Sequence, residues 1–495
     1  MKTISKSKYI LYKKCPKLFW NSINNPMIMP EPDEAAQGVF EDGKIVGDYA
    51  KKYFDNTVDV TTFDKNGNLN IGKMIALTVE ELQDGINTIA EASFNYDNIF
   101  CSVDLLHPVE GGYEIYEVKA STSISNYHIM DIAFQKHVLE LAGLNIVNCF
   151  ILNINNKYIR QGDLDLHKLF NKTKVDNDEL FIYTLNNIEN EIKELNFILE
   201  NEQPNIEISQ NCKSSKCQLF EYCHSHLPKP NVFDIYDMRG CYSKIKKGII
   251  TFEDVINNNI KLGKYQKVQI ESYLNNITLT VDKEAVNSFL NKLKYPIYHL
   301  DFESITPPVP LSDNAWPYEQ ITTQYSLHIE HEDGSLDHKE FLGDSVDPRR
   351  EIALQLCEDI PMDSCVMAFN KSFECKRLEE LASLYPDLNV HLLNISNNII
   401  DLADPFSDAS YYHKDMGKRY SIKSVLPALY PNDPELDYHS LPGVHNGTEA
   451  KNIYLKMLSS DENSKKEIRH GLLEYCKLDT LAMVKILKKL KESIN

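Results

Sequence analysis

The chain has 495 residues, of which 42% are hydrophobic and 25% charged, and its formal net charge is −20. The length suggests about three domains of roughly 150 residues, and no run of about 18 apolar residues predicts a membrane span. The acidic charge argues against nucleic-acid binding unless divalent ions neutralise clustered carboxylates. The N-terminus also lacks the apolar stretch of a signal peptide, so we expect a cytoplasmic protein that does not associate with membranes.

Three regions follow one another along the chain, and together they predict an α/β protein. Residues 1–228 mix strand and helix patterns and end in a group of cysteines. Residues 229–290 form a mostly helical connector, and residues 291–495 run from a strand to a long final helix. No GxxxxGK[ST] sequence occurs, which excludes the phosphate-binding loop of a motor protein.

Residues 101–122, CSVDLLHPVEGGYEIYEVKAST, predict two strands joined by a turn at Gly111–Gly112. Asp104 ends the first strand, and Glu117 and Lys119 share one face of the second. Two carboxylates and a lysine on adjacent strands can bind a divalent ion and stabilise the charge that develops on a phosphate. On spacing alone, a surface hairpin with an ion pair is the simpler alternative.

Eleven cysteines, an odd number in a long chain, make a disulfide framework a poor explanation. Three of them cluster in NCKSSKCQLFEYCHSH, and a fourth stands in YKKCPKLFW near the start: Cys212, Cys217, Cys223 and Cys15. Four thiolates from both ends of a domain can hold a 4Fe–4S cluster. The alternatives are Zn²⁺, with His224 or His226 as the fourth ligand, and buried free thiols.

The stretch IYHLDFES at 297–304 places two carboxylates in an otherwise apolar strand. Strand alternation puts His299, Asp301 and Glu303 on one face, while Leu300 and Phe302 lie on the other and can pack on a helix. The two carboxylates are therefore about 7 Å apart along the strand, and divalent ions can bridge such a pair. A strand edge that faces water is the plain alternative.

Two later stretches supply further candidate residues. EYCKLDTLAM lies in the long final helix and places Tyr475 and Asp479 four residues apart on one face. VMAFNKSFECKRLEEL reads as a strand followed by a helix that carries Glu374. A tyrosine hydroxyl beside a metal-binding aspartate can orient water, although an ordinary core tyrosine would show the same spacing. Asp401 and Asp404 are substitute ligands for Glu374.

In this order, the motifs of residues 291–495 resemble the DEDD exonuclease superfamily, in its tyrosine-containing subtype with an RNase H-like fold. The resemblance implies that Asp301 and Glu303 form the first motif and that Glu374 ends the second. Tyr475 and Asp479 then form the third. It also implies 3′–5′ hydrolysis of nucleic acid with two Mg²⁺ or Mn²⁺ ions, while Tyr475 orients the attacking water. The chain departs from the family at Glu374, where an aspartate is usual.

Residues 1–228 resemble the RecB-like PD-(D/E)XK nucleases of the iron–sulfur branch, which includes AddB and small CRISPR-associated members. The resemblance implies that Asp104 and Glu117 bind metal and that Lys119 is catalytic. Gln135, in DIAFQKHVLEL, corresponds to the glutamine of the helix that follows. The four cysteines correspond to the 4Fe–4S ligands, although the first gap between the late cysteines is wider than usual. Gly47 and Leu139 stand where the family has a metal-binding histidine and a tyrosine.

The combination of both regions resembles a bacterial family known mainly as an uncharacterised conserved domain. We therefore expect a metal-dependent nuclease whose C-terminal region is a 3′–5′ exonuclease and whose N-terminal region cuts or grips nucleic acid. Single-stranded DNA is the favoured substrate, and a helicase or another repair or defence protein is the expected partner. The first alternative is a nucleic-acid-binding module with an inactive N-terminal nuclease fold and a structural metal cluster. The second is a redox or structural iron–sulfur protein with no nuclease role.

Overall fold

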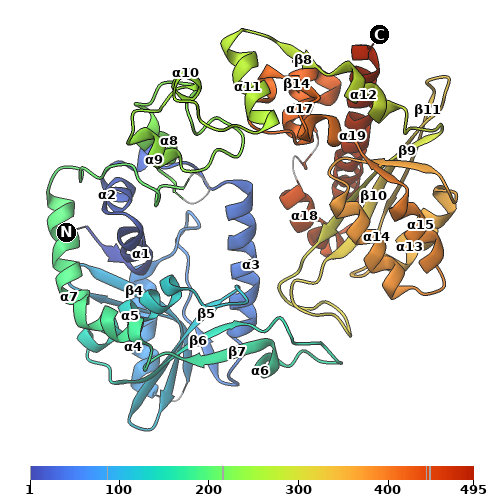
Figure 1. Ribbon diagram of the computed structural model, residues 1–495. Coiled ribbons are helices and arrows are strands. Elements are labelled where there is room, and N and C mark those ends of the chain that lie inside the picture. The colour runs from blue at the N-terminus through green and yellow to red at the C-terminus, as the bar shows by residue number, and fades with distance from the viewer. Residues whose placement is uncertain (1, 86, 214–216, 442, 445–446, 495) are drawn as a thin grey trace. The chain divides into compact units, whose positions relative to one another are not determined.

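A computed structural model describes residues 2–85, 87–213, 217–441, 443–444 and 447–494 and shows a mixed α/β protein, which confirms the predicted class (Figure 1). The chain divides by its internal contacts into two units. Unit 1 comprises residues 1–224 and 307–319, and unit 2 comprises residues 225–306 and 320–495. The predicted domains, 1–228, 229–290 and 291–495, stay predictions. No helix of the described residues has both the length and the apolar character needed to cross a bilayer.

The sheet of unit 1 has seven strands in the order β2-β3-β4-β5-β6-β7, with β1 paired to β4. The pairs β2–β3, β5–β6 and β1–β4 are parallel, and the other neighbours are antiparallel. The turn that joins β4 to β5 lies at Glu110–Gly111, one residue before the predicted Gly111–Gly112, and Gly112 is the first residue of β5. The strands are β1 (Ile4–Ser5), β2 (Thr57–Asp59), β3 (Thr88–Tyr96), β4 (Ile99–Val109), β5 (Gly112–Lys119), β6 (Ile146–Ile154) and β7 (Phe170–Lys174).

Helices cover both faces of this sheet (Figure 1). One face packs against α1, α2, α4, α5 and α7 in a large apolar core, and the other packs against α3. The helices of unit 1 are α1 (Lys6–Lys14), α2 (Pro16–Asn24), α3 (Glu34–Ala50), α4 (Ile71–Asp84), α5 (Asn126–Leu141), α6 (Leu166–Leu169), α7 (Glu179–Glu200) and α8 (Phe220–His224), with the 3₁₀ helix η1 (Pro26–Ile28).

The side-chain alternation along β3 shifts by one residue at Glu91. This residue has a left-handed φ of 58°, so that Ile89, Ala92 and Phe94 all reach the larger core. In the β3–β4 register, Glu91 stands opposite Asp104. This position lies between the paired residues that precede it and those that follow it. The irregularity therefore lies beside one of the predicted metal ligands.

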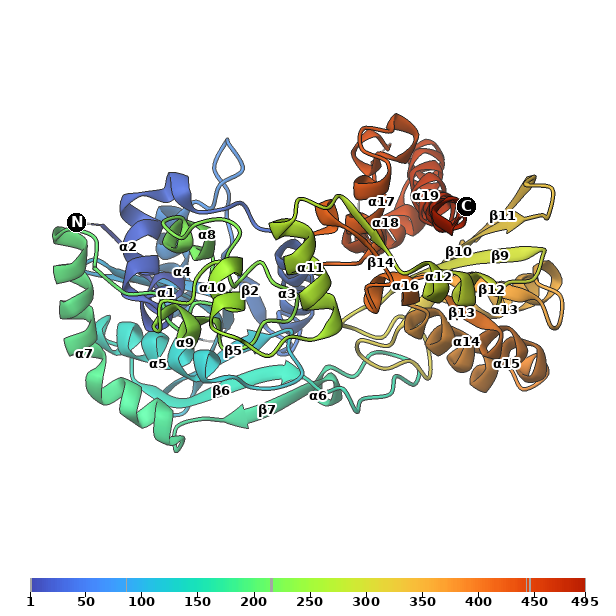
Figure 2. The same ribbon diagram turned by 45° about the horizontal axis from the view of Figure 1, so that its top comes forward.

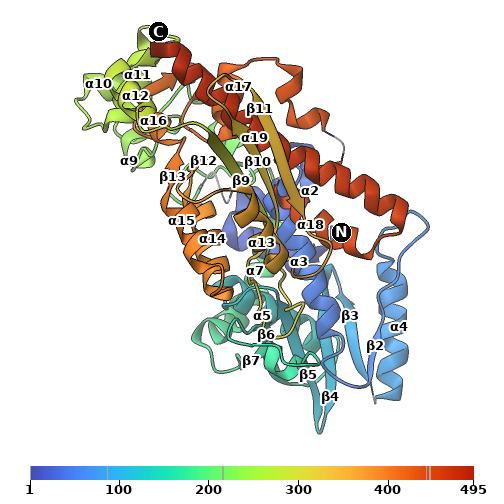
Figure 3. The same cartoon turned by 90° about the vertical axis from the view of Figure 1, so that its right-hand side faces the viewer.

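The main sheet of unit 2 has five strands in the order β11-β10-β9-β12-β13. The pairs β9–β10 and β10–β11 are antiparallel, whereas β9–β12 and β12–β13 are parallel. Helix α19 lies over one face of β9 and β10, and α13, α14 and α15 cover the other (Figures 2 and 3). The strands are β9 (Ile297–Ile305), β10 (Ile321–Glu330), β11 (Leu336–Leu342), β12 (Cys365–Ala368) and β13 (Ile399–Asp401).

The two faces of β9 have the chemistry that the sequence predicts. Leu300 and Phe302 are buried in a core with α13, α14 and α15. Ile297 packs in a second core with residues of α19, so Asp301 and Glu303 lie on the same face as this helix. The alternation of β9 therefore directs both carboxylates toward α19.

The remaining elements of unit 2 include a second, two-stranded sheet. Strand β8 (Leu279–Val281), in the predicted connector, pairs antiparallel with β14 (Tyr411–His413). The helices of unit 2 are α9 (Cys241–Ile245), α10 (Phe252–Asn257), α11 (Lys264–Leu274), α12 (Lys283–Leu290), α13 (Arg349–Asp359), α14 (Ser372–Leu384), α15 (Asn389–Asn397), α16 (Asp404–Ser407), α17 (Ile422–Leu429), α18 (Gly447–Ser459) and α19 (Glu462–Ile494). Three short 3₁₀ helices complete it: η2 (Lys414–Met416), η3 (Pro434–Leu436) and η4 (Tyr438–Ser440).

The β4–β5 turn gives a matched pair of substitutions in unit 1. Gly111→Ala should cost about 1 kcal/mol, because φ is 87° but a new Cβ meets open space. Gly112→Ala should cost about 3 kcal/mol, because its Cβ would collide with the backbone of Asn145. Urea unfolding followed by tryptophan fluorescence measures both, since Trp20 and Trp316 belong to unit 1. Equal midpoints for the two variants would contradict this account of the turn.

Candidate active sites

Three carboxylates of unit 2 converge from two elements that are far apart in sequence. Asp301 and Glu303 project from β9, and Asp479 projects from α19. Each offers a carboxylate oxygen, and these oxygens all lie within 4.8 Å of one another. Asp479 is only 9% exposed. We call these three residues the acidic centre of unit 2, and carboxylate oxygens are the ligands that Mg²⁺ and Mn²⁺ prefer.

Glu374 lies close enough to this centre to act on it electrostatically. It is in the first turn of α14, is 3% exposed, and its Oε2 atom has no hydrogen-bond partner. After burial and the charge of Asp479, which are the larger causes, the charge of Glu374 also raises the pKa of Asp301 and Glu303. A buried carboxylate oxygen without a partner is costly, and a metal ligand is one way to satisfy it.

Asp401 has a different role from the substitute ligand predicted for it. Its carboxylate accepts hydrogen bonds from the backbone N–H groups of Asn370 at 2.9 Å, Lys371 at 3.1 Å and Ala403 at 2.9 Å. These bonds hold the strand-to-helix connection before α14, where Asn370 has a left-handed φ of 62°. Asp404, the other substitute, is exposed at the start of α16. Glu374 is therefore the better candidate of the three.

Two tyrosines flank Asp479. Tyr475 is 4% exposed, and burial together with the charge of Asp479 raises its pKa far above the ordinary value. Tyr438, in η4, donates a hydrogen bond from its hydroxyl to Asp479 Oδ1 at 2.6 Å, and its ring lies 5.9 Å from that of Tyr475. Tyr438 carries no signal in the sequence, because it belongs to no spaced motif and reaches the site only through the fold.

The acidic centre is under electrostatic strain. Burial and then the charge of Asp479 raise the pKa of Glu303 to about 8, and burial raises that of Asp479 to about 6. The pKa of Asp301 lies well above its ordinary value for the same reasons. Lys423 of α17 offsets part of this cost for Glu303 and Asp479. Within the described parts of the chain, no lysine or arginine forms an ion pair with these three carboxylates. Divalent cations would relieve the strain.

This strain predicts an unusual pH dependence in chelator-treated protein. Because the folded pKa of Glu303, about 8, exceeds its ordinary value of 4.5, the folded state binds the extra proton between these limits. Its stability is therefore highest below the lower value and falls as the pH rises toward the upper one. Glu303→Gln removes that charge, so it should raise the melting temperature by a few degrees at about pH 8.5 and change it little at about pH 5.

Thermal unfolding followed by circular dichroism measures this difference. Glu379→Gln, on the exposed side of α14, is the matched control and should have no effect at either pH. Added Mn²⁺ should stabilise the wild-type chain more than the variant. The same shift at both pH values would mean that Glu303 is not held above its ordinary pKa.

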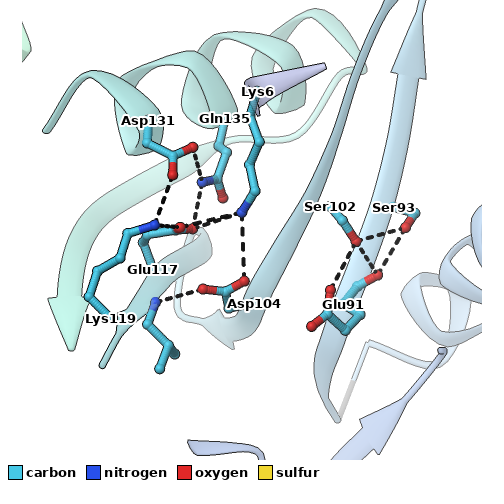
Figure 4. Close-up of polar contacts among 10 residues, drawn as sticks. Lys6, Glu91, Ser93, Ser102, Asp104, Glu117, Lys119, Asp131 and Gln135 are labelled. Atoms are coloured by element: carbon cyan, nitrogen blue, oxygen red, sulfur yellow. Dashed lines mark hydrogen bonds and ion pairs between the residues drawn. The ribbon is translucent and has the colours of Figure 1, made fainter. Parts of the chain in front are cut away.

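In unit 1, the predicted residues Asp104, Glu117, Lys119 and Gln135 come together on β4, β5 and α5 (Figure 4). Glu117 is 1% exposed and accepts hydrogen bonds from Gln135 Nε2 at 2.6 Å and from the ammonium group of Lys119. Asp104 Oδ2 accepts a hydrogen bond from the backbone N–H of Val118 at 2.7 Å. The side-chain amide oxygen of Gln135 is buried without a hydrogen-bond partner.

Two further charged residues belong to this group. Asp131 binds Lys119 at 2.9 Å, and Lys6, from the first turn of α1, contacts both Asp104 and Glu117. Asp131 lies four residues before Gln135, a helical spacing that could have revealed it. Lys6 carried no such signal, because it is about a hundred residues from its partners. We call these six residues the charged centre of unit 1.

The pKa values of this centre diverge. Burial raises the pKa of Glu117, but the neighbouring ammonium groups of Lys119 and Lys6 outweigh this effect and hold the pKa well below the ordinary range. Burial and the charge of Glu117 raise the pKa of Asp104 to about 7. Carboxylates with such different proton affinities are typical of catalytic sites, although structural ion pairs produce the same divergence.

A cavity of about 190 Å³ opens beside Asp104 and is lined by Glu91, Gly43, Gly47 and Asp48 among others. A Cβ atom added to Gly43 or Gly47 would meet open space. The place where the resembled family has a histidine is therefore open next to the carboxylates. Leu139, where that family has a tyrosine, is fully buried in the large core of unit 1.

The four predicted cysteines line one cavity of about 880 Å³, which we call the cysteine pocket: Cys15, Cys212, Cys217 and Cys223. Cys15 stands between α1 and α2, and Cys223 lies in α8. Lys13, Lys14, Lys17 and Lys213 also line this cavity. His224 directs Nδ1 to the backbone oxygen of Phe220 at 2.7 Å, and His226 is exposed.

Comparisons with known proteins give a family match and several relatives. A family model described as a domain of unknown function (DUF2779) matches residues 298–421. The uncharacterized protein UU173 of Ureaplasma parvum is 28% identical over 296 residues, which cover 53% of this chain and 41% of that protein. The uncharacterized protein MG366 of Mycoplasma genitalium is 27% identical over 222 residues, covering 41% and 33%. Its homolog in Mycoplasma pneumoniae is 28% identical over 225 residues, covering 42% and 34%.

The chain therefore spans less than half the length of each of these relatives. The matched family segment contains Asp301, Glu303 and Glu374 but ends before Asp479. Through residues 298–421 the chain is thus similar to the family of that domain of unknown function. This segment supplies Asp301 and Glu303 of the acidic centre and the nearby Glu374.

Proposed function

We propose that this chain is a metal-dependent nuclease and that unit 2 is a 3′–5′ exonuclease. The observation that carries the proposal is the acidic centre of unit 2, where Asp301, Glu303 and Asp479 meet within 4.8 Å. Such a cluster is expensive to bury without cations, and the unpartnered oxygen of Glu374 adds a fourth acidic group nearby. Four carboxylates with little compensating charge suit two divalent ions better than one.

The residues of this centre fit the resemblance to DEDD exonucleases. The mixed sheet of unit 2 agrees with an RNase H-like fold, and Tyr475 lies beside Asp479 as in the tyrosine-containing subtype. Bound Mg²⁺ or Mn²⁺ would activate water and stabilise the leaving oxygen. The hydroxyl of Tyr475 would orient that water, and Tyr438 would hold the carboxylate of Asp479 in place.

Unit 1 has the charged groups of a RecB-like nuclease centre, namely Asp104, Glu117, Lys119 and Gln135, and the buried, unpartnered oxygen of Gln135 points to a further polar ligand. Lys119 would stabilise the charge that develops on a phosphate. This unit either cuts single-stranded DNA or grips it for unit 2. We place the protein in the cytoplasm, with a helicase or another repair or defence protein as partner.

A cleavage assay with Mn²⁺ and 5′-labelled single strands of DNA and RNA tests the proposal. We expect a ladder that shortens from the 3′ end and is reduced about a hundredfold or more in Asp301→Ala, which loses a metal ligand. Lys119→Ala should leave this ladder intact, and Glu379→Ala is the exposed control. Degradation that survives Asp301→Ala but fails in Lys119→Ala would assign the activity to unit 1. Binding without cleavage in every protein would favour the nucleic-acid-binding module.

We also propose a 4Fe–4S cluster in the cysteine pocket. Its four thiols come from both ends of unit 1, and the cavity of about 880 Å³ is larger than one zinc ion needs. Burial raises the pKa of Cys223, Lys17 lowers it, and the neighbouring thiols raise it again, as expected of sulfur atoms gathered in one place. His224, the alternative zinc ligand, is directed to its own helix.

Protein purified without oxygen should be brown and contain about four iron and four sulfide per chain. Cys15→Ser should lower the iron content and bleach the visible absorption, because it removes one of the four thiolates. Cys365→Ser, on β12 of unit 2, is the control. A content of one zinc ion per chain, without iron, would show that the pocket holds a zinc site and not the cluster.

A further inference from the structure

Lys6 occupies a position that the backbone sets firmly. The short strand β1 (Ile4–Ser5) pairs with β4 at Ile99 and Phe100, and Ile4 is fully buried. Ser5 then caps α1 by accepting a hydrogen bond from the backbone N–H of Lys8 at 3.3 Å. Lys6, the first residue of the helix, is therefore held between a strand pairing and a helix cap. Its side chain extends toward β4 and β5.

The ammonium group of Lys6 contacts both carboxylates of the predicted metal pair. It lies 3.2 Å from Glu117 Oε2, 3.3 Å from Glu117 Oε1 and 3.6 Å from Asp104 Oδ1. Figure 4 shows the carboxylate of Glu117 between Lys6 on one side and Lys119 on the other. Lys119 also binds Asp131, so two ammonium groups form ion pairs with three carboxylates.

This balance differs from that of unit 2. In the charged centre of unit 1, when Asp104, Glu117 and Asp131 are all ionised, the two lysines leave one negative charge uncompensated. In the acidic centre of unit 2, no carboxylate forms an ion pair with lysine or arginine in the described parts of the chain. Divalent cations bind where negative charge is left without a partner. The two centres should therefore bind different numbers of divalent ions.

We propose that Lys6 is a positioning residue that limits the Asp104–Glu117 pair to one divalent cation. This inference rests on the proposed metal-binding role of unit 1. Lys6 contacts both carboxylates from the side of α1, and Asp104, which also lines the cavity of about 190 Å³, leaves an open side from which a metal ion can reach the pair. Unit 1 then binds one divalent ion, and the ammonium group of Lys6 takes the place of a second cation. Unit 2, in contrast, binds two divalent ions.

Mn²⁺ binding to the full chain tests this, measured by calorimetry and by the paramagnetic resonance of free Mn²⁺. Asp301→Asn with Asp479→Asn first removes binding to unit 2, and this double variant should bind one Mn²⁺. Adding Lys6→Met should admit a second ion and tighten the first roughly tenfold, the scale on which a neighbouring charge shifts the affinity of a carboxylate. Lys6→Arg keeps the charge and should restore a single ion.

Lys8→Met is the matched control, because Lys8 lies on the same helix and its ammonium group binds the backbone oxygen of Ser22 at 2.9 Å. Tryptophan fluorescence reports whether unit 1 stays folded, and Lys6→Gln replaces Lys6→Met if the latter unfolds. One Mn²⁺ with an unchanged affinity in Lys6→Met or Lys6→Gln, or no bound Mn²⁺, would overturn the proposal.

Since the readout is binding, the two proposals fail separately. A chain that cleaves no nucleic acid but gains a second Mn²⁺ in Lys6→Met would refute the nuclease and keep the assignment of Lys6. A chain that cleaves nucleic acid, but whose Lys6→Met variant binds Mn²⁺ as the parent does, would support the nuclease proposal and refute the role of Lys6.

Discussion

The packing of α19 across β9 and β10 is the contact on which the acidic centre of unit 2 depends. Buried hydrogen bonds set its register: Thr480 contacts Ser326 at 2.7 Å and His328 at 2.7 Å, and Gln324 donates to the backbone oxygen of Leu472 at 2.9 Å. Buried polar groups have few alternative partners, so they specify one arrangement more strictly than apolar packing does. A helix shifted by one turn would carry Asp479 about 5 Å away from Asp301.

The two units meet the same electrostatic problem in different ways. A buried carboxylate must be paired, protonated or bound to a metal. Unit 1 pairs Glu117 with two lysines, so the pKa of Glu117 falls while that of Asp104 rises, whereas unit 2 leaves its carboxylates with little opposing charge and their pKa values rise. Pairing makes a centre that is organised by the protein alone. The unpaired centre is more dependent on the cations and protons around it.

The sequence predicted features that follow from local periodicity. The alternation of β9 separated Leu300 from Asp301, the double glycine marked the β4–β5 turn, and the strand-to-helix pattern located Glu374. Tyr438 and Lys6 could not be found in this way, because each reaches its site from a separate element and only the fold brings it there. The shift at Glu91 was also hidden, since a left-handed φ at a glutamate has no local sequence signal.

Helix α1 joins the two chemical features of unit 1. It has nine residues, a length of about 13 Å, with Lys6 at one end and Cys15 capping the other. Tyr9 and Lys13 both bind Glu191 of α7 at 2.5 Å, which braces the middle of the helix. A short hydrogen-bonded helix behaves as a rod, so neither end can turn without the other. A ligand that draws the thiols together would therefore also set the angle at which the ammonium group of Lys6 meets the carboxylates of β4 and β5, in the middle of the sheet.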